Sequence, residues 1–180
     1  IPDALEDCDK TINQLNNFLE KYPDLPGKKI GVVQGKTYDE IVRCYQSIKD
    51  KVDMIGVSFD YSIYEEWFPD ESTKYHSWSS GRSYLLSELL NDNVIDTNKP
   101  HHLLGIGIAY EGRLHDSQYS WIYSIDTSNP VMCGIDNITY TSTGYDDKPT
   151  TKMFTIMNED VLDKWNNIEY NINRFKTFWW

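Results

Sequence analysis

The sequence predicts an α/β fold in which parallel strands alternate with helices. This prediction rests on three short apolar runs that contain β-branched residues, at 30–35, 102–107 and 121–126. Runs of this length, separated by stretches of helical period, are typical of βα units. Active sites in such folds form where the strands end, so we expect Gln34, Gly107 and Asp126 to be neighbours in one pocket.

The elements follow one another in a regular order along the chain. Apolar residues at three- and four-residue spacing predict a first helix over residues 1–22, which Pro23 ends. The same spacing predicts further helices at 38–50, at 81–90 and near 111–120. The predicted parallel strands lie between these helices, at 30–34, 52–59, 102–108 and 121–126. A final amphipathic helix is expected over 158–178, with Asn158 as its N-cap.

Three further segments carry expectations. Residues 60–80 are rich in aromatic side chains, and we expect them to form an ordered, functional loop. Residues 138–143 alternate in polarity, as an exposed hairpin strand does. After Asp126, the Thr-Ser-Asn-Pro sequence predicts a sharp turn.

The predicted order leaves two topologies open. Four parallel strands with their helices make half of a TIM-type (β/α)8 barrel, and a half barrel exposes two unpaired strand edges that something else must cover. The alternative is a small doubly wound sheet. A nucleotide site in that fold needs a Gly-rich turn after the first strand, and Gln34-Gly35-Lys36 is too short to supply one.

Composition limits the classes of protein and partner. The chain has 180 residues, 39% of them apolar, which suits a single domain and indicates no membrane span. A net charge of −11 argues against general coating of nucleic acid, so any such contact must be local. We expect the basic residues near the predicted strands to be solvated surface charges: Lys28, Lys29, Lys36, Arg82 and Arg113.

The cysteines and the first residue add four expectations. Cys8, Cys44 and Cys133 form no Cys-x-x-Cys pair and have no His at zinc-ligand spacing. We therefore expect reduced, buried thiols, a cytoplasmic location, and neither a metal nor a cofactor. Because the first residue is Ile1, we also expect the chain to begin inside a longer polypeptide.

Asp126 is the main candidate for chemistry. A carboxylate at the end of a parallel strand is well placed to attack a sugar anomeric carbon and to hold a covalent glycosyl intermediate. The alternative interpretation is a structural Asp that caps its own turn. A glycosidase with paired carboxylates is a further possibility, but no second acid stands clearly at a strand end.

Other strand ends offer groups that could read a flat base. The amide of Gln34 has the donors and acceptor needed for a purine edge, although the backbone alone could satisfy it. Gly56, with the main chain of Val57 and Ser58, and Gly105 would let peptide groups approach a ligand, and Leu104 would supply an apolar face. We expect His101 and His102 to precede their strand at the opposite rim and to be structural.

These segments together resemble the tRNA-guanine transglycosylase superfamily. Residues 31–35 are similar to its Gln-Gly base-reading strand, residues 54–58 to its next glycine-containing strand, and residues 99–107 to its Lys-Pro-x-x-Leu-Met-Gly-Val-Gly segment. The resemblance covers roughly residues 28–130 and implies that the chain is the C-terminal half of a barrel. It also implies a base pocket and a nucleophile, formed by Gln34, Gly35, Gly56, Val57, Ser58, Leu104, Gly105 and Asp126. Asp3 resembles a further base-contacting Asp of the family.

Departures from the family pattern narrow what the resemblance implies. The zinc module and the Arg-bearing segment of the enzymes that act on tRNA are absent, so the chain looks more like the phage and bacterial relatives that insert 7-deazaguanine bases into DNA. The implied activity is exchange of guanine for a 7-deazaguanine derivative in DNA, within a bacterial or host cytoplasm, and the alternative is a tRNA-guanine transglycosylase of the queuine type. The family's acid/base segment, Asp-Ser-Gly-Gly, is also absent. A partner chain would then supply the N-terminal half; otherwise the chain is a non-catalytic barrel subunit that binds a partner.

Overall fold

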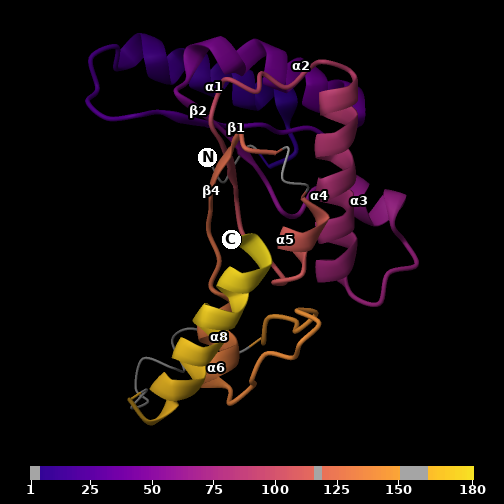
Figure 1. The fold of residues 1–180 in the computed structure, drawn as a ribbon. Coiled ribbons are helices and arrows are strands. Elements are labelled where there is room, and N and C mark those ends of the chain that lie inside the picture. The colour runs from indigo at the N-terminus through magenta and orange to yellow at the C-terminus, as the bar shows by residue number, and fades with distance from the viewer. Residues whose placement is uncertain (1–4, 116–118, 151–161) are drawn as a thin grey trace.

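A computed structural model describes residues 5–115, 119–150 and 162–180. Four strands alternate with helices along the chain (Figure 1). The first half contains α1 (Cys8–Lys21), β1 (Ile30–Val32), α2 (Tyr38–Ile48), η2 (Lys49–Lys51), β2 (Met54–Val57), α3 (Ser62–Trp67) and α4 (Lys74–Asn91). The second half contains β3 (His101–Leu103), α5 (Glu111–Leu114), β4 (Ile122–Ile125), α6 (Asn129–Ile135), η3 (Leu162–Lys164) and α8 (Trp165–Trp179).

The four strands form one sheet in the order β1-β2-β3-β4, and every pair is parallel. This confirms the predicted α/β fold with parallel strands. A doubly wound sheet is defined by a point at which the strand order reverses, and this sheet has no such point. Because parallel crossovers are right-handed, an order without reversal puts every crossover helix on the same face of the sheet. β1 and β4 are the two edges of the sheet.

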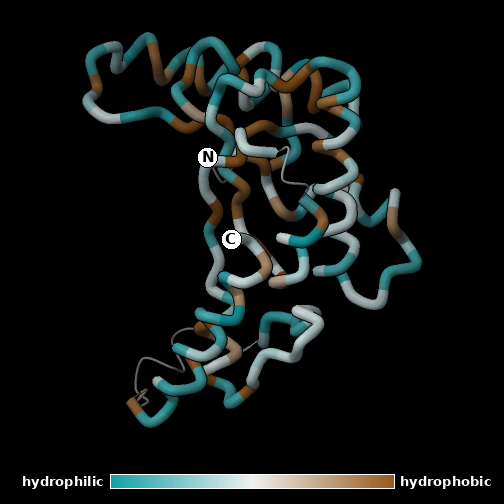
Figure 2. Tube along the Cα trace, viewed as in Figure 1, coloured by the Kyte–Doolittle hydropathy of each residue, from teal (hydrophilic) through white to brown (hydrophobic). Residues whose placement is uncertain are grey.

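The main core lies between that face and the helices. Ile55 and Val57 of β2 and Leu103 of β3 point towards the helices and are buried. They join one apolar cluster with side chains from α2 and α4, including Ile41, Cys44, Tyr45, Ile48, Leu85, Leu86 and Leu89. Figure 2 shows hydrophobic residues along the strands and the helix segments that cover them. The cluster confirms that α2 and α4 cover the same side of the sheet.

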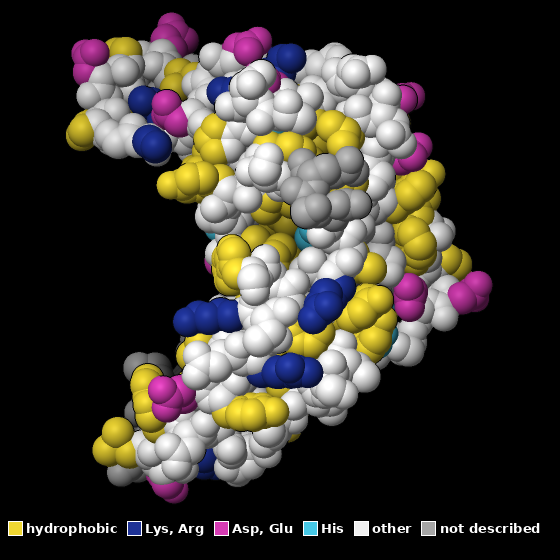
Figure 3. Space-filling view, in the orientation of Figure 1, with side chains coloured by type: hydrophobic (Ala, Val, Ile, Leu, Met, Phe, Trp, Pro, Cys, Tyr) yellow, Lys and Arg dark blue, Asp and Glu magenta, His cyan; other side chains and the backbone are white. Residues whose placement is uncertain are grey.

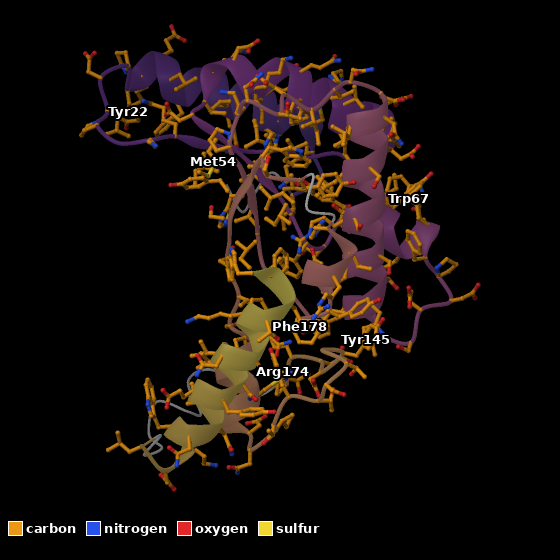
Figure 4. All side chains as sticks on the ribbon, in the orientation of Figure 1. Tyr22, Met54, Trp67, Tyr145, Arg174 and Phe178 are labelled. Carbon is orange, nitrogen blue, oxygen red and sulfur yellow. The ribbon has the colours of Figure 1, made fainter. Side chains whose placement is uncertain are left out.

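The opposite face of the sheet is covered much less. Because side chains alternate along a strand, Ile30, Met54, Gly56, His102 and Ser124 share this second face. Ile30 is 51% exposed. Figure 3 shows a crescent-shaped molecule with hydrophobic side chains along its hollow side, and Figure 4 places Met54 on the side of the sheet away from Trp67. We call this surface the open face.

Helix starts follow ordinary capping chemistry. The side chains of Asp7, Thr37 and Thr73 accept hydrogen bonds from main-chain N–H groups in the first turns of α1, α2 and α4. The cap at Thr73 starts α4 seven residues before the predicted position. Consequently most of 60–80 is helical, and the expectation of a loop there is wrong.

The aromatic side chains of this segment form packing rather than a free surface. Tyr61 and Tyr64 are buried in the core, and Trp67 packs edge-to-face against Tyr84 of α4. Phe59 and Trp78 make a second edge-to-face pair. The aromatic-rich segment at 60–80 therefore packs against α4 and extends the core.

Several other expectations need correction. Residues 138–143 form no strand; their main chain is held by side chains of other segments, such as Asn171 Oδ1 on the N–H of Tyr140 at 2.9 Å. Of the helix expected near 111–120, the described residues contain the four residues of α5, and residues 116–118 lie outside the described part of the chain. Asn158 lies outside the described residues, and the described part of the last helix begins at Trp165.

One of the basic residues expected at the surface is buried instead, whereas Arg113 is exposed as expected. Arg82 is fully buried, because its guanidinium pairs with Glu111 inside the core. Arg113 lies over the ring of Phe178, with 5.1 Å from Cζ to the ring centroid. Among the described residues, no helix is long and apolar enough to cross a membrane.

Candidate active site

The carboxyl ends of the four strands carry the residues singled out in the sequence. Gln34 follows β1, Ser58 follows β2, Leu104 and Gly105 follow β3, and Asp126 follows β4. All four strands are parallel, so these residues lie along the same edge of the sheet. The sheet thus places them as the sequence predicts, in chain order.

Asp126 is held in place and is accessible. Its side chain is 58% exposed, and Oδ1 accepts a hydrogen bond from the main-chain N–H of Gly105, with 3.1 Å between N and O. Oδ1 also lies 3.0 Å from Nε2 of His102. Within the described parts of the chain, Oδ2 makes no hydrogen bond.

The turn after Asp126 is built by its neighbours. The hydroxyl of Thr127 donates to the carbonyl of Ile106 at 2.7 Å and accepts from the N–H of Asn129 at 3.1 Å. Pro130 stands in the first turn of α6, where its missing N–H costs nothing. The Asp126 carboxylate is therefore not the group that caps this turn, so the alternative in which Asp126 caps its own turn is wrong.

His102 is the residue that sequence reasoning missed. His101 and His102 are the first two residues of β3, and His102 lies opposite Ser124 on β4. Its Nδ1 lies 2.8 Å from Ser124 Oγ, and its Nε2 reaches Asp126 across the diagonal of the two strands. The placement of His102 at the opposite rim was wrong, because β3 is too short to separate its two ends.

The neighbouring histidine is structural, as expected. His101 is fully buried, with Nδ1 2.8 Å from the carbonyl oxygen of Lys99 and Nε2 3.0 Å from the hydroxyl of Tyr45. A neutral ring with its proton on Nδ1 satisfies both contacts. Burial lowers the pKa of His101 to about 4.

Gly105 has a conformation that only glycine adopts readily. Its φ is +64°, and a Cβ at this position would lie 2.6 Å from Cδ1 of Phe59. This backbone turn aims the N–H of Gly105 at Asp126. In the structure Gly105 contacts the Asp126 carboxylate, and its expected contact with a base stays a prediction.

Gln34 is tied to the chain's own N-terminal segment. Its side chain is buried, and Oε1 accepts from the main-chain N–H of Glu6 at 2.7 Å. This is the alternative in which the backbone satisfies the amide oxygen. The amide nitrogen makes no hydrogen bond within the described residues, so the NH2 group of Gln34 is still available as a donor.

Gln34 and Asp126 do not share a pocket in the described chain. They follow the two edge strands, and three strand spacings of about 4.8 Å put them roughly 14 Å apart across a flat sheet. A groove of about 310 Å³ lies beside Gln34, between α1 and β1, and Asp126 is not among its lining residues. The pocket expected to be shared by Gln34, Gly107 and Asp126 is therefore not formed by the described residues alone.

The remaining predicted base-contacting residues are packed against protein. A Cβ on Gly35 would lie 2.7 Å from the main-chain nitrogen of Ile41, so this glycine lets β1 pack closely on α2. The carbonyl of Gly56 accepts from Val33 N, and that of Val57 accepts from Leu104 N. These main-chain groups already have partners.

Ser58, Leu104 and Asp3 complete the predicted set. Ser58 is buried; its N–H donates to the hydroxyl of Tyr61 and its own hydroxyl donates to Asp60. Leu104 lies beside Gly56 on the open face, where a Cβ on that glycine would be 3.4 Å from Leu104 Cδ1. Asp3 lies outside the described residues.

The cysteines are unsuited to nucleophilic chemistry. All three are free and buried, as expected, and burial raises the pKa of Cys44 and Cys133 to about 12. Among the described residues, no group of three His, Cys, Asp or Glu side chains could hold a metal ion. Asp126 is thus the exposed, held carboxylate on which chemistry at these strand ends would depend.

Comparison of the chain with protein families, with curated proteins and with solved structures finds no match in any of the three.

Proposed function

We propose that the chain is the C-terminal half of a (β/α)8 barrel that exchanges a nucleobase through a covalent bond to Asp126. The observation that carries the proposal is the accessible carboxylate of Asp126, at the end of β4 and held through Oδ1 alone. Asp126 would attack with Oδ2, so Oδ1 could keep its hydrogen bonds throughout the reaction. A preformed geometry of this kind lowers the entropic cost of a displacement.

The reaction consists of two balanced displacements. Asp126 Oδ2 forms a bond to C1′ of a guanosine nucleotide while the C1′–N9 bond breaks, and guanine leaves with the electron pair and takes up a proton. A 7-deazaguanine derivative then gives up its N9 proton and displaces the carboxylate from C1′. Two such steps replace one difficult exchange. A base in duplex DNA must first be flipped out or presented single-stranded.

The uncovered face of the sheet supports the barrel. Parallel sheets are almost always covered on both faces, whereas here Ile30 on the open face is exposed. The two edge strands, β1 and β4, each have a partner on one side only within the described chain. Four further parallel strands, paired to β1 and β4, would cover this face and close the barrel. Curvature on closing would also bring Gln34 closer to Asp126 than a flat sheet allows.

A labelled-guanine assay tests the proposal. Tagged wild-type chain, isolated alone and as the complex purified through the tag, is incubated with labelled guanine and single-stranded DNA, duplex DNA or tRNA. We expect label to enter DNA more than tRNA. Asp126→Asn should lower the rate more than about a thousandfold, because the nucleophile is lost. The matched control is Asp50→Asn. Asp50 is an exposed residue just before β2, at the opposite end of the sheet from Asp126.

Two outcomes would contradict the proposal. Undiminished exchange by Asp126→Asn would remove this carboxylate from the role of nucleophile. Absence of both exchange and a covalent DNA adduct in the wild-type complex would leave a second candidate function, a non-catalytic subunit. The occupied main-chain groups of Gly56 and Val57 favour that second candidate.

A further inference from the structure

A buried ion pair lies directly behind the candidate site. Arg82, in the middle of α4, is fully buried, and Glu111 at the start of α5 is 1% exposed. Nε and Nη2 of Arg82 donate to the two carboxylate oxygens of Glu111 at 2.7 and 2.8 Å. The pair is bidentate, which fixes the plane of the guanidinium.

The rest of the guanidinium is directed at the strand ends. Nη1 of Arg82 donates to the carbonyl oxygen of Leu104 at 2.5 Å and lies 3.5 Å from that of Val57. The Glu111 carboxylate also accepts from Ser79 Oγ at 3.1 Å and lies 3.3 Å from Nε2 of His115. Although burial alone would raise the pKa of Glu111, the charge of Arg82 lowers it. The pair is therefore ionised.

Stability alone does not account for this arrangement. Burying two charges costs several kcal/mol each, and well-packed apolar side chains of the same volume are often as stable or more so. The pair therefore points to a geometric role. The main-chain group that Arg82 contacts most closely is the carbonyl of Leu104.

That carbonyl belongs to the peptide unit that holds Asp126. The C=O of Leu104 and the N–H of Gly105 are the two polar groups of one planar amide. Arg82 contacts the oxygen, and the nitrogen donates to Asp126 Oδ1 at 3.1 Å. If this peptide flipped, its carbonyl would face the carboxylate and the Arg82 donor would lose its partner.

We propose that Arg82 is a positioning residue for Asp126. Held by Glu111, it fixes the Leu104–Gly105 peptide so that the Gly105 N–H stays on Oδ1 and Oδ2 faces the open side. The positive charge of Arg82 beside the Leu104 carbonyl also polarises the amide and strengthens the Gly105 N–H as a donor. The catalytic consequence rests on the proposed function; the structural part does not.

The test replaces both charged groups together. Arg82→Met with Glu111→Met roughly keeps the volume and avoids an unpaired buried charge, whereas either change alone leaves one charge buried without its partner and is strongly destabilising. In wild-type protein we expect the NMR signal of the Gly105 amide proton to move as the Asp126 carboxylate titrates, and Asp126→Asn to abolish this movement. In the folded double variant the movement should fall by at least half.

Controls separate this role from general damage. Lys99→Met removes another cation from a main-chain carbonyl, that of Val52, at the far end of the sheet. It should leave the Gly105 titration unchanged. Arg82→Lys keeps the positive charge but loses the planar, bidentate guanidinium. The Gly105 signal in this variant should therefore move by an amount between those of the wild type and the double variant. If the double variant does not fold, Arg82→Lys carries the test.

The outcomes for the two proposals are distinct. A Gly105 signal that still follows Asp126 fully in the folded variants would overturn the positioning role, whatever the exchange activity. A lost titration in a protein whose wild type exchanges no base would support the positioning role and contradict the proposed function. If both proposals hold, kcat of the double variant should fall about 10- to 100-fold with little change in KM.

Discussion

At the scale of the residue, the environment of each polar side chain decides what it can do. The two adjacent histidines show this, because alternation along β3 sends their rings to opposite faces. His101 stacks on Tyr45 with 5.8 Å between ring centroids and is buried, whereas His102 lies on the open face beside Asp126. The same side chain is thus a core residue at one position and a neighbour of the candidate nucleophile at the next.

His101 should make stability depend on pH. Burial lowers its pKa to about 4, whereas an unfolded His titrates near 6.5. Between these values the unfolded state binds the extra proton, so stability is complete above about pH 6.5 and falls as the pH drops towards 4. The loss is about 3 kcal/mol, from 1.36 kcal/mol per pKa unit. Urea unfolding of wild type and His101→Gln at pH 4.5–7 measures it.

The comparison between the two proteins isolates this histidine. Acidic groups titrate in both proteins, so only the difference in slope belongs to His101. Equal slopes in wild type and His101→Gln would show that His101 binds its proton equally in the folded and unfolded states, so that burial does not lower its pKa.

At the scale of the element, close approach between helices fixes where each one lies. Gly81 of α4 faces α3, and a Cβ there would lie 2.4 Å from Cβ and 2.6 Å from Cγ of Tyr64. The missing side chain therefore lets α3 pack on α4 and cover the core beside Arg82. The aromatic-rich segment becomes helical because it has this surface to pack on.

Gly81→Ala should destabilise the protein although alanine favours helices. The gain in helix propensity is about 1 kcal/mol, but Tyr64 must move, and overpacking typically costs about 1–3 kcal/mol. We expect a net loss and a lower Tm in thermal unfolding. Lys74→Ala, at an exposed position of the same helix, should change stability by less than about 0.5 kcal/mol. A Tm for Gly81→Ala at or above the wild-type value would show that α3 yields without cost.

At the scale of the whole molecule, the sheet is covered much more on one side than on the other, although Met54 on the open face is buried. The core lies between α2, α4 and the buried side chains of β2 and β3, and the open face forms the hollow of the crescent (Figure 3). Central strands pair on both sides, whereas β1 and β4 each leave one edge unpaired within the described chain. Such edges are sites at which another chain or segment can add strands.

Hydrogen exchange should reveal this one-sided architecture. We expect main-chain amides of β2 and β3 to exchange most slowly in the isolated chain, and amides on the outer edges of β1 and β4 to exchange much faster. Addition of strands in the purified complex should slow the edge amides selectively. Uniform protection of all four strands in the isolated, monomeric chain would contradict the unpaired edges.

Some features of the fold could be read from the sequence because they depend on local pattern. Alternating strand and helix periods predict the βα order, and the position of Asp126 after β4 follows from it. The burial of Arg82 could not be predicted in this way. Its carboxylate partner is 29 residues away and the carbonyl of Leu104 is 22 residues away, and no local spacing connects them.

The sequence by itself determined the parallel α/β fold, the succession of strands and helices along the chain, and the candidate residues at the strand ends, whereas the structure decided between the two topologies. Only the tertiary structure decided which of those residues meet. Strand register brought His102 to Asp126, the turn at Gly105 aimed its N–H at the same carboxylate, and the sheet kept Gln34 at the other edge. The physical reason is that periodicity encodes which way a side chain faces, whereas contact requires the register and packing of segments distant along the chain.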